Sequence, residues 1–220
     1  MVIPWRRIAF ALLNGIDVRL GLARVGDLLP HEEFLPSRAE EVAKSISRLG
    51  AVLRPILVDA RTGVVLDGAH RLAALRMLGA RYAPVAAVDY ASDSVALRGW
   101  ARLYEPSAID DIRRLLPVRR SVDLGGVRAF ELDGLDSYYD IKELEARGHR
   151  LLGVVVPGAL RRLGAGAVAV VPPEPTKDLV LSAATSRRLL PPRSTRHVTP
   201  AKEVRLKVPL GALVRGDPDA

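Results

Sequence analysis

Five consecutive residues, Asp67, Gly68, Ala69, His70 and Arg71, combine a flexible backbone with three side chains that can bind ions. A glycine at the start of a helix lets backbone amides approach an anion closely, and the helix dipole favours negative charge there. His70 and Arg71 add donors at the same place, and an arginine fork matches the oxygens of a phosphate. Asp67 could orient one of these donors or help to hold a divalent ion. The segment predicts a phosphate site; a solvated surface turn is the open alternative.

The pair His31 and Glu32 is a second candidate, in a loop that follows the first expected strand. A loop carboxylate beside a histidine can be tuned to abstract a proton when it faces a cleft. Most exposed glutamates have no such role, so the pair alone only permits acid–base chemistry.

A third candidate is the segment Ser194–His197, which lies between Pro191-Pro192 and Thr199-Pro200. Its two hydroxyls, guanidinium and imidazole could clamp an anion or an amino acid, although a polar tail loop would have the same composition. Trp100 lies in a polar neighbourhood and could line a pocket or belong to the core. Three of the four histidines fall in the three candidate segments, and only His149 does not.

The elements that position these residues follow from hydrophobic patterning and from helix and turn signals. We expect strands at 18–28, 55–58, 64–66, 83–88, 127–132, 151–156, 167–171 and 204–208, and helices at 37–49, 72–78, 110–116, 140–147, 159–163 and 176–188. Ser37 is the expected N-cap of the first helix, with Glu40 as its capping-box partner. The phosphate candidate thus lies at a strand–turn–helix junction, and the chain is of the mixed α/β (α+β) class.

Composition limits the function classes. The chain has 220 residues, enough for one large domain or two small ones, and no cysteine, which excludes disulfides and cysteine nucleophiles. No apolar run is long enough to span a membrane, and the N-terminus does not resemble a signal peptide, so we expect a cytoplasmic protein with no membrane partner. One asparagine, no glutamine, two methionines and 16 prolines suggest a thermophile.

The formal net charge of +8 raises the question of nucleic-acid binding. The charge is spread evenly, with 13 basic and 10 acidic residues in 1–100 and 20 and 15 in 101–220. No basic run exceeds two residues, and no aromatic residues alternate with basic pairs as a stacking platform requires. A basic surface of this kind suits small anions equally well, so nucleic acid is not the expected partner.

The segment Asp67–Arg71, after a strand and before a helix, resembles the nucleotide-binding box of the ParB/sulfiredoxin superfamily. Together with Pro30-His31-Glu32 upstream and Ser194–Val198 near the C-terminus, it looks like the archaeal free serine kinases. Those enzymes phosphorylate L-serine to O-phospho-L-serine, with ADP as donor in the archaeal type and ATP in a bacterial relative. The matching points run from about residue 18 to 214. The resemblance implies Mg²⁺ as cofactor, and phosphoserine that would feed cysteine synthesis.

The resemblance also implies roles for particular residues. Glu32 matches the catalytic glutamate, which would accept the proton of the serine hydroxyl as its oxygen attacks the transferred phosphoryl group. Gly68, Ala69, His70 and Arg71 match the phosphate-binding box. The box of these kinases usually reads Asp-Gly-His-His-Arg, and Ala69 replaces the first histidine here, so one side-chain donor is missing while the backbone amide remains.

The remaining matched residues are those that would hold the amino acid. Ser45 and Trp100 match positions that line the serine pocket. Thr195, Arg196 and His197 match the C-terminal segment that returns to the cleft. The family fold implies an N-terminal ParB/sulfiredoxin-like domain, a second smaller α/β domain and an active cleft between them. We therefore expect an extension at 1–17, a nucleotide-binding domain at 18–100, a second domain at 101–190 and the returning segment at 191–220.

Three other functions occur among proteins that resemble this superfamily. A ParB-like, nucleotide-dependent DNA-binding protein is the main alternative, but residues 124–171 favour strands over the helix-turn-helix that follows the box in ParB proteins. Sulfiredoxin chemistry needs a cysteine in the box, where this chain has Ala69. A nuclease would need a cluster of acidic metal ligands, which the sequence does not contain. The expected partners are therefore L-serine and an adenine nucleotide; neither the donor, the metal ligands nor the oligomeric state follows from the sequence.

Overall fold

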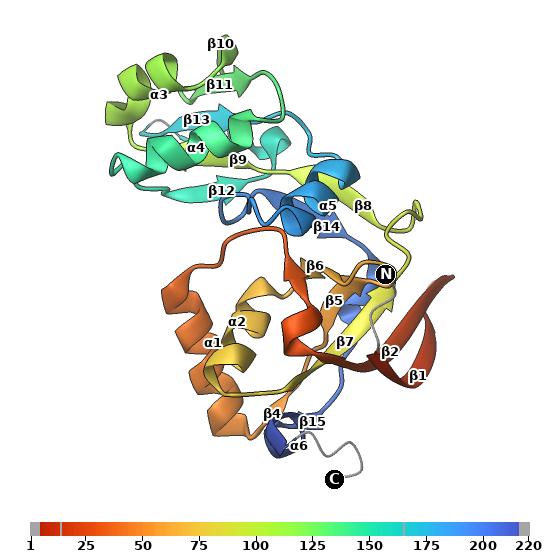
Figure 1. Cartoon of the computed structure of the whole chain (residues 1–220). Coiled ribbons are helices and arrows are strands. Elements are labelled where there is room, and N and C mark those ends of the chain that lie inside the picture. Colours follow the sequence, from red (N-terminus) through yellow and green to blue (C-terminus); the bar gives the residue numbers. More distant parts are fainter. Residues whose placement is uncertain (1–4, 14, 165, 216–220) are drawn as a thin grey trace. The chain divides into compact units, whose positions relative to one another are not determined.

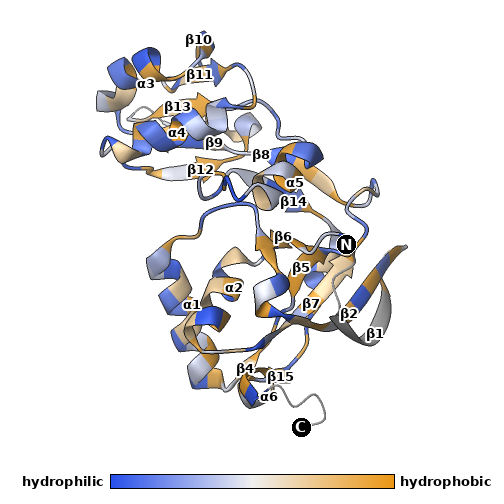
Figure 2. Ribbon diagram, in the orientation of Figure 1, coloured by the Kyte–Doolittle hydropathy of each residue, from blue (hydrophilic) through white to orange (hydrophobic). Residues whose placement is uncertain are grey.

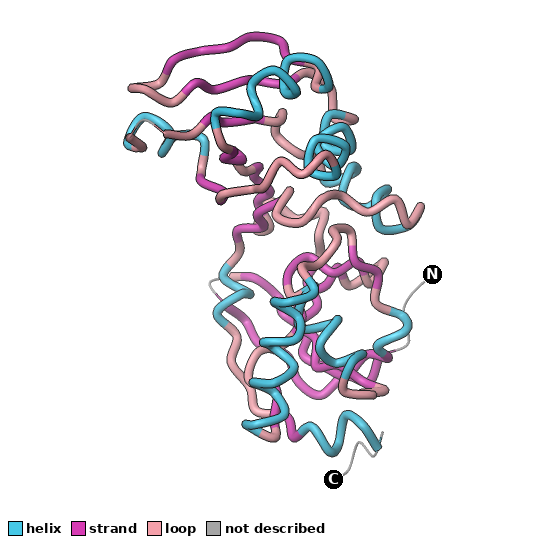
Figure 3. Tube along the Cα trace, turned by 90° about the vertical axis from the view of Figure 1, so that its left-hand side faces the viewer, coloured by secondary structure: helices cyan, strands magenta, loops and turns pink. Residues whose placement is uncertain are grey.

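The computed structural model describes residues 5–13, 15–164 and 166–215 and divides the chain into two compact units (Figure 1). Unit 1 contains residues 1–96, 180–192 and 197–220, and unit 2 contains residues 97–179 and 193–196. Both units mix helices with strands (Figure 3), in agreement with the expected α/β class.

A six-stranded mixed sheet forms the centre of unit 1, in the order β1-β2-β7-β5-β6-β3. Its strands are β1 (Trp5–Leu13), β2 (Ile16–Arg24), β3 (Leu29–Pro30), β5 (Ile56–Asp59), β6 (Val64–Asp67) and β7 (Tyr82–Val88). All four residues of β5 and the first three of β6 are buried, and the inner strands are the apolar ones (Figure 2). The sequence placed residues 1–17 in an extension; of these, Trp5–Leu13 form β1, which pairs antiparallel with β2.

The two main helices of unit 1, α1 (Pro36–Leu49) and α2 (Ala69–Met77), pack against each other and against the sheet. Ile46 of α1 and Leu72 and Leu75 of α2 belong to the same buried cluster as residues of β5, β6 and β7. Gly50 ends α1 in the left-handed conformation at φ +63°, as its position after the apolar stripe predicts.

The start of α1 differs from the prediction. The N-cap residue is Leu35, which makes no side-chain capping bond, and Pro36 occupies the first turn. The expected Ser37–Glu40 capping box was therefore wrong. The fixed φ of proline is already helical, so Pro36 starts the helix two residues earlier than a serine cap at position 37 would.

Two returning segments complete unit 1. After 180–192, the chain re-enters at His197 and forms η4 (Pro200–Glu203), β15 (Val208–Pro209) and α6 (Leu210–Arg215). β15 pairs antiparallel with β4 (Ala51–Val52). The strand expected at 204–208 is mostly absent, because only Val208 and Pro209 find a pairing partner there. Leu213 of α6 is fully buried in the main cluster of unit 1.

Unit 2 contains a five-stranded sheet in the order β10-β11-β13-β9-β12. Its strands are β9 (Ala101–Tyr104), β10 (Val118–Asp123), β11 (Arg128–Leu132), β12 (Gly153–Val155) and β13 (Val168–Val171). The helices are α3 (Ile109–Leu115) and α4 (Ser137–Ala146), and the short helices η2 (Pro106–Ala108) and η3 (Pro157–Arg162) are of the 3-10 type. The strands β8 (Ala96–Gly99) and β14 (Thr195–Val198), and helix α5 (Lys177–Thr185), carry the chain between the units.

Alternation along the strands gives this sheet two different faces. Phe130, Val168 and Val170 pack with Ile112 of α3 and Ile141 of α4. Their neighbours in the strands, including Ala129 and Ala169, pack on the other side with Leu160 of η3. The expected helices at 110–116 and 140–147 and strands at 127–132 and 167–171 are confirmed within one to three residues.

Over the part of the chain that the structure describes, no helix has the length and apolar character needed to cross a lipid bilayer.

Leu213 tests whether the C-terminal helix is part of the unit 1 core. We expect Leu213→Ala to lower the free energy of unfolding by about 2–5 kcal/mol, because it leaves a cavity in a fully buried position. Leu49→Ala, at a position that is 56% exposed, should change it by less than about 0.5 kcal/mol. Urea unfolding followed by circular dichroism measures both. Equal effects of the two substitutions would contradict the packing of α6.

Candidate active site

The phosphate candidate lies where β6 ends and α2 begins. Gly68 is the N-cap residue of α2 and has a φ of +106°, a conformation that favours glycine. A Cβ on Gly68 would lie 2.7 Å from Nη2 of Arg71, so the absence of a side chain also makes room for this guanidinium. Ala69 is the first residue of α2. The strand–turn–helix arrangement expected for residues 64–78 is confirmed.

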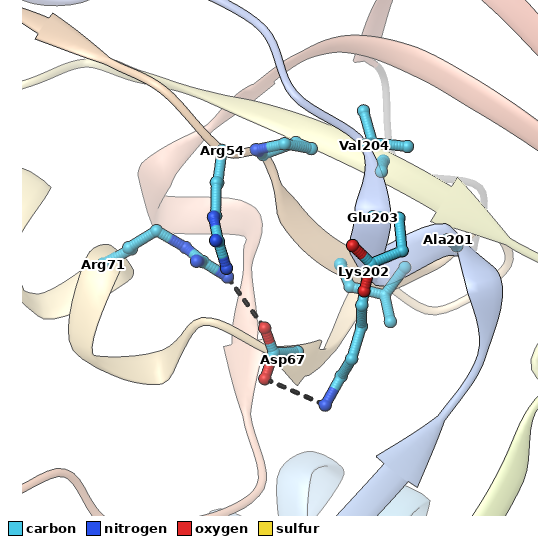
Figure 4. A pocket seen from close by; sticks show the side chains of 10 residues that line it. Arg54, Asp67, Arg71, Ala201, Lys202, Glu203 and Val204 are labelled. Atoms are coloured by element: carbon cyan, nitrogen blue, oxygen red, sulfur yellow. Dashed lines mark hydrogen bonds and ion pairs between the residues drawn. The ribbon is translucent and has the colours of Figure 1, made fainter.

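The carboxylate of Asp67 holds two cations. Arg71 lies four residues further along the chain, whereas Lys202 comes from a distant part of the sequence. Oδ2 accepts a hydrogen bond of 2.9 Å from Nη2 of Arg71, and Oδ1 lies 3.3 Å from Nζ of Lys202 in η4. Figure 4 shows the two side chains reaching Asp67 from opposite sides. They line a pocket of about 250 Å³, together with Arg54, Pro55, Leu57, Ala86, Ala201, Glu203 and Val204.

The charges of this pocket suit an anion. Three cations, Arg54, Arg71 and Lys202, face two carboxylates, and the side chain of Glu203 is 80% exposed. Nε of Arg71 is buried and makes no hydrogen bond within the described structure. A buried N–H without an acceptor is unfavourable, so a bound anion that accepts from this side chain would remove the deficit.

The loop that carries Glu32 is fixed to β6 by its neighbour. Nδ1 of His31 lies 2.7 Å from the carbonyl oxygen of Val65 and therefore donates to it. This bond leaves Nε2 of His31 directed at Glu32, whose Oε1 lies 3.5 Å away. The side chain of Glu32 is 14% exposed, so it is largely shielded yet still reachable from solvent.

His70 joins the same loop to the phosphate candidate. Its Nε2 accepts a hydrogen bond of 3.1 Å from the backbone amide of Leu35, the residue that precedes α1. In the neutral ring Nδ1 therefore carries the proton. The side chain that the sequence assigned to phosphate binding thus also holds the start of α1 and the end of the Glu32 loop.

The segment 180–192 supports the loop from a second direction. Glu32 forms a parallel bridge with Leu190, the amide of Glu33 donates to the carbonyl of Leu190 at 2.9 Å, and the amide of Leu190 donates to the carbonyl of His31 at 2.9 Å. The backbone on both sides of Glu32 is therefore held by hydrogen bonds. A short strand of this kind was not predicted at 190.

His197 lies in a buried polar group beside His31. The two rings meet edge to face at 5.5 Å, and Nε2 of His197 lies 2.9 Å from the hydroxyl of Tyr90. Burial, and next the charge of Asp59, raise the pKa of Tyr90, so the phenol stays neutral. His31 and His197, assigned to separate candidate segments by sequence, are therefore in contact.

In unit 2 the structure brings together Trp100, Thr195 and Arg196. Nε1 of Trp100 donates to the carbonyl of Thr195 at 3.2 Å, and the guanidinium of Arg196 lies over the indole at 5.3 Å. Nε of Arg196 is buried without a hydrogen bond in the described structure. Ser45 is exposed in the middle of α1, and its expected role in serine binding stays a prediction.

Sequence reasoning missed several residues of these groups, namely Arg54, Tyr90, Leu190 and Lys202. Arg54 and Lys202 are two among 33 basic residues, and nothing in their local sequence distinguishes them. Tyr90 lies two residues after the end of β7, at the carboxyl end of an inner strand, and this position could have been noted.

Within residues 5–13, 15–164 and 166–215, no three histidine, aspartate or glutamate side chains gather in a way that could hold a metal ion. A magnesium ion bound with a nucleotide takes only one or two carboxylates from the protein, and phosphates and waters complete its shell. Asp67, at 40% exposed against 80% for Glu203, is the less exposed of the two carboxylates of the pocket and fits this lesser requirement.

The chain was compared with known proteins. No protein-family model matches it. It is 32% identical over 175 residues to a ParB-like protein of Sulfolobus acidocaldarius, covering 78% of this chain and 86% of the relative. It is 28% identical over 234 residues to an ATP-dependent L-serine kinase of Staphylothermus marinus, covering 87% and 90%. It is 25% identical over 226 residues to an ADP-dependent L-serine kinase of Thermococcus kodakarensis, covering 84% and 88%.

Among solved structures, a free serine kinase mutant in complex with ADP matches with a TM-score of 0.68 and 21% identity, over 96% of both chains. At this identity the likeness concerns the fold, which agrees with the ParB/sulfiredoxin-like architecture that the sequence predicts.

Gly68 and Gly79 both have a positive φ, but only Gly68 lies against Arg71. Substituting each of them therefore separates the effect of backbone strain from the effect of the contact with Arg71. Gly68→Ala and Gly79→Ala should each lose about 1–2 kcal/mol of stability, because alanine is strained at φ +106° and +69°. Only Gly68→Ala also displaces the Arg71 guanidinium, since Gly79 has open space around it. Calorimetric titration with pyrophosphate should therefore show weaker binding for Gly68→Ala and wild-type binding for Gly79→Ala. Equal binding by both variants would contradict the placement of the anion at this turn.

Proposed function

Because this chain belongs to the family of ParB-like proteins and free L-serine kinases, we propose that it phosphorylates free L-serine to O-phospho-L-serine with an adenine nucleotide as donor. One observation carries the proposal beyond the family. Two hydrogen bonds, from Leu35 to His70 and from His31 to Val65, join the loop of Glu32 to α2 and β6, the elements that carry Arg71 and Asp67 of the anion pocket. A carboxylate that could act as a base is thus built on the same structural block as three cations.

Glu32 is the general base of the proposed reaction. Its carboxylate takes the proton of the serine hydroxyl, the serine oxygen forms a bond to the terminal phosphorus, and the bond from that phosphorus to the bridging oxygen of the nucleotide breaks. Nucleoside monophosphate leaves when ADP is the donor, and ADP leaves when ATP is the donor. The backbone hydrogen bonds on both sides of Glu32 keep its position fixed during the transfer.

The positive charges of the pocket neutralise the transferred phosphoryl group. Phosphoryl transfer asks a protein mainly for positioning and for compensation of charge. The N-terminus of α2 at Gly68 and Ala69 supplies backbone amides, and Arg71, Lys202 and Arg54 supply cations. Asp67 would help to hold Mg²⁺, which when bound would neutralise phosphate charge. Asp67 also keeps Arg71 and Lys202 in place.

Trp100, Thr195, Arg196 and His197 are proposed to hold the amino acid, together with Ser45. Support comes from Arg196, whose guanidinium is stacked on Trp100 and has a buried Nε without an acceptor in the described structure. An arginine held in this way can bind a carboxylate with its remaining donors. Relatives include both an ATP-dependent and an ADP-dependent L-serine kinase, so we propose an adenine nucleotide and let the assay identify it.

Nucleotide-dependent DNA binding is the second candidate function. The relative named a ParB-like protein and the net charge of +8 favour it. Unit 2 argues against it, because α3 and α4 are separated by the strands β10 and β11 instead of the short turn of a helix-turn-helix.

The first test is an end-point assay with L-serine and Mg²⁺, with ADP in one sample and ATP in another. We expect phosphoserine, detected by chromatography, together with AMP or ADP as the spent nucleotide. If folded protein forms no phosphoserine with either donor, the kinase proposal fails. Nucleotide-dependent retention of a DNA duplex would then support the second candidate.

Glu32→Gln tests the base. It should lower kcat about 10²- to 10⁴-fold, the usual contribution of a positioned base, and leave nucleotide affinity within about twofold. Glu33→Gln is the matched control, since Glu33 is the exposed neighbour in the same loop and should retain turnover. Full turnover by Glu32→Gln would remove this residue from the mechanism.

Arg71→Ala and Lys202→Met test the phosphate site. Each removes one of the two cations that face Asp67, so each should weaken nucleotide binding about 10-fold or more in calorimetry. Arg205→Ala is the control, because Arg205 follows Lys202 closely and pairs with the exposed Glu203. Unchanged affinity in both Arg71→Ala and Lys202→Met would place the nucleotide elsewhere.

A further inference from the structure

Arg102 is a fully buried arginine that the proposed mechanism does not use. It lies in β9 and is 1% exposed. Ala101 packs on the η3 side of the sheet, and Tyr104 packs with the helices α3 and α4. Arg102 therefore shares with Tyr104 the face that the two helices cover. A charge at such a position requires partners, because burying it alone is strongly unfavourable.

The guanidinium uses its three nitrogens for three different partners. Nε donates to the hydroxyl of Tyr104 at 3.1 Å, Nη2 donates to Oε1 of Glu145 at 2.5 Å, and Nη1 donates to the backbone carbonyl of Arg193 at 3.2 Å. The hydroxyl of Tyr104 also donates to Oε1 of Glu145, at 2.9 Å. Burial opposes the charge, but Tyr104 and Glu145 outweigh it and raise the pKa of Arg102, so the charge is retained.

The bond from Arg102 to the carbonyl of Arg193 is the one that suggests a role for this arginine. Arg193 has a φ of +60°, a left-handed conformation that is uncommon for a residue with a side chain. Its side chain is exposed, so it is its backbone that the buried guanidinium holds. Residues 194–197 are called the amino-acid segment, because they include the residues proposed to hold the amino acid. Arg193 directly precedes Ser194, Thr195 and Arg196, which are the residues of this segment that lie in unit 2.

The same segment is held a second time two residues further on. Nε1 of Trp100 donates to the carbonyl of Thr195, while Nη1 of Arg102 donates to the carbonyl of Arg193. Donors at 100 and 102 thus face acceptors at 195 and 193 in antiparallel order. The backbone between the two acceptors is fixed at both ends, and Arg196 is stacked on Trp100 beside it.

We propose that Arg102 is a positioning residue that fixes the amino-acid segment, and so sets the affinity for L-serine without contacting it. The inference rests on the proposed function. A guanidinium is required because three nitrogens in one plane reach three acceptors in fixed directions, whereas an ammonium is a single point of donation. Glu145 and Tyr104 orient the fork, and the carbonyl of Arg193 receives its remaining arm.

The test is the kinetic comparison of Arg102→Lys and Arg102→Met with wild type. Arg102→Lys should raise KM for L-serine at least 10-fold and leave KM for the nucleotide within twofold; Arg102→Met should show a larger effect of the same kind. Hydrogen exchange of peptides covering 193–196 should be at least fivefold faster in both variants. An unchanged KM for L-serine together with unchanged exchange in folded Arg102→Lys would overturn the proposal.

Two controls separate positioning from general stability. Arg120→Lys alters an exposed arginine of β10 in the same unit, which is paired with Glu131, and should change neither KM nor the exchange of 193–196. Ile112→Val truncates a buried residue of α3 and should lower Tm without a selective rise in KM for L-serine. If Ile112→Val reproduces the selective rise, Arg102 acts through stability alone and the proposal is wrong.

The outcomes also distinguish this inference from the kinase proposal. If Arg102→Met does not fold, Glu145→Gln replaces it, and it should loosen 193–196 through the loss of charge on the partner of Arg102. If the wild-type protein forms no phosphoserine, the kinase function fails, and the claim about L-serine fails with it. The exchange measurement then decides alone whether Arg102 fixes 193–196.

Discussion

A single carboxylate organises the pocket of unit 1. Asp67 lies at the end of β6 and contacts Arg71 from α2 and Lys202 from η4. Without it, two cations would face each other in a partly enclosed space of about 250 Å³, and their repulsion would separate them. Asp67 can hold both cations but cannot neutralise both, so an excess of positive charge remains for a ligand. The left-handed turn at Gly68 makes this possible, because any side chain there would occupy the place of the Arg71 guanidinium.

The junction between the Glu32 loop, α1 and α2 contributes both to folding and to the proposed chemistry. The first amides of a helix have no partner within the helix, and α1 begins without a side-chain cap. His70 accepts from one of these amides, at Leu35, and so replaces the missing cap from another element. A buried amide left without a partner costs about 1–3 kcal/mol, so this contact helps to decide where α1 begins. The Glu32 loop is therefore positioned in part by His70, a residue of the phosphate candidate itself.

Local signals predicted local structure well. The strand–turn–helix at 64–78, the helix ended by Gly50 and the unit 2 strands 127–132 and 167–171 follow from glycine positions and from hydrophobic patterning, and the structure confirms them. Two predictions failed. The Ser37 cap failed locally, because the neighbouring Pro36 already begins α1, and the strand at 204–208 failed non-locally, because β4 pairs with only Val208 and Pro209.

For the candidate site, too, the local features could be predicted and the long-range contacts could not. The sequence suggested candidate residues by their type and spacing, but the contact of His31 with His197 and the approach of Lys202 to Asp67 could not be predicted from it. These contacts join residues far apart in the chain, and no periodicity encodes them. Arg102 is a further example. A single arginine within an apolar stretch does not indicate that the folded chain will place three hydrogen-bond acceptors around its guanidinium.

The route of the chain through unit 1 has a consequence for its synthesis. The Glu32 loop pairs with Leu190, and the core includes Leu213, although unit 2 is made in between. Contacts this distant in sequence form late and slow the search for the native state. A nascent chain that has emerged only as far as residue 179 contains β5, β6 and β7. It still lacks the later segments that complete unit 1. Unit 1 therefore cannot complete its fold on the ribosome before the segments that contain Leu190 and Leu213 have emerged, and until then part of its apolar surface stays exposed to aggregation or to chaperones.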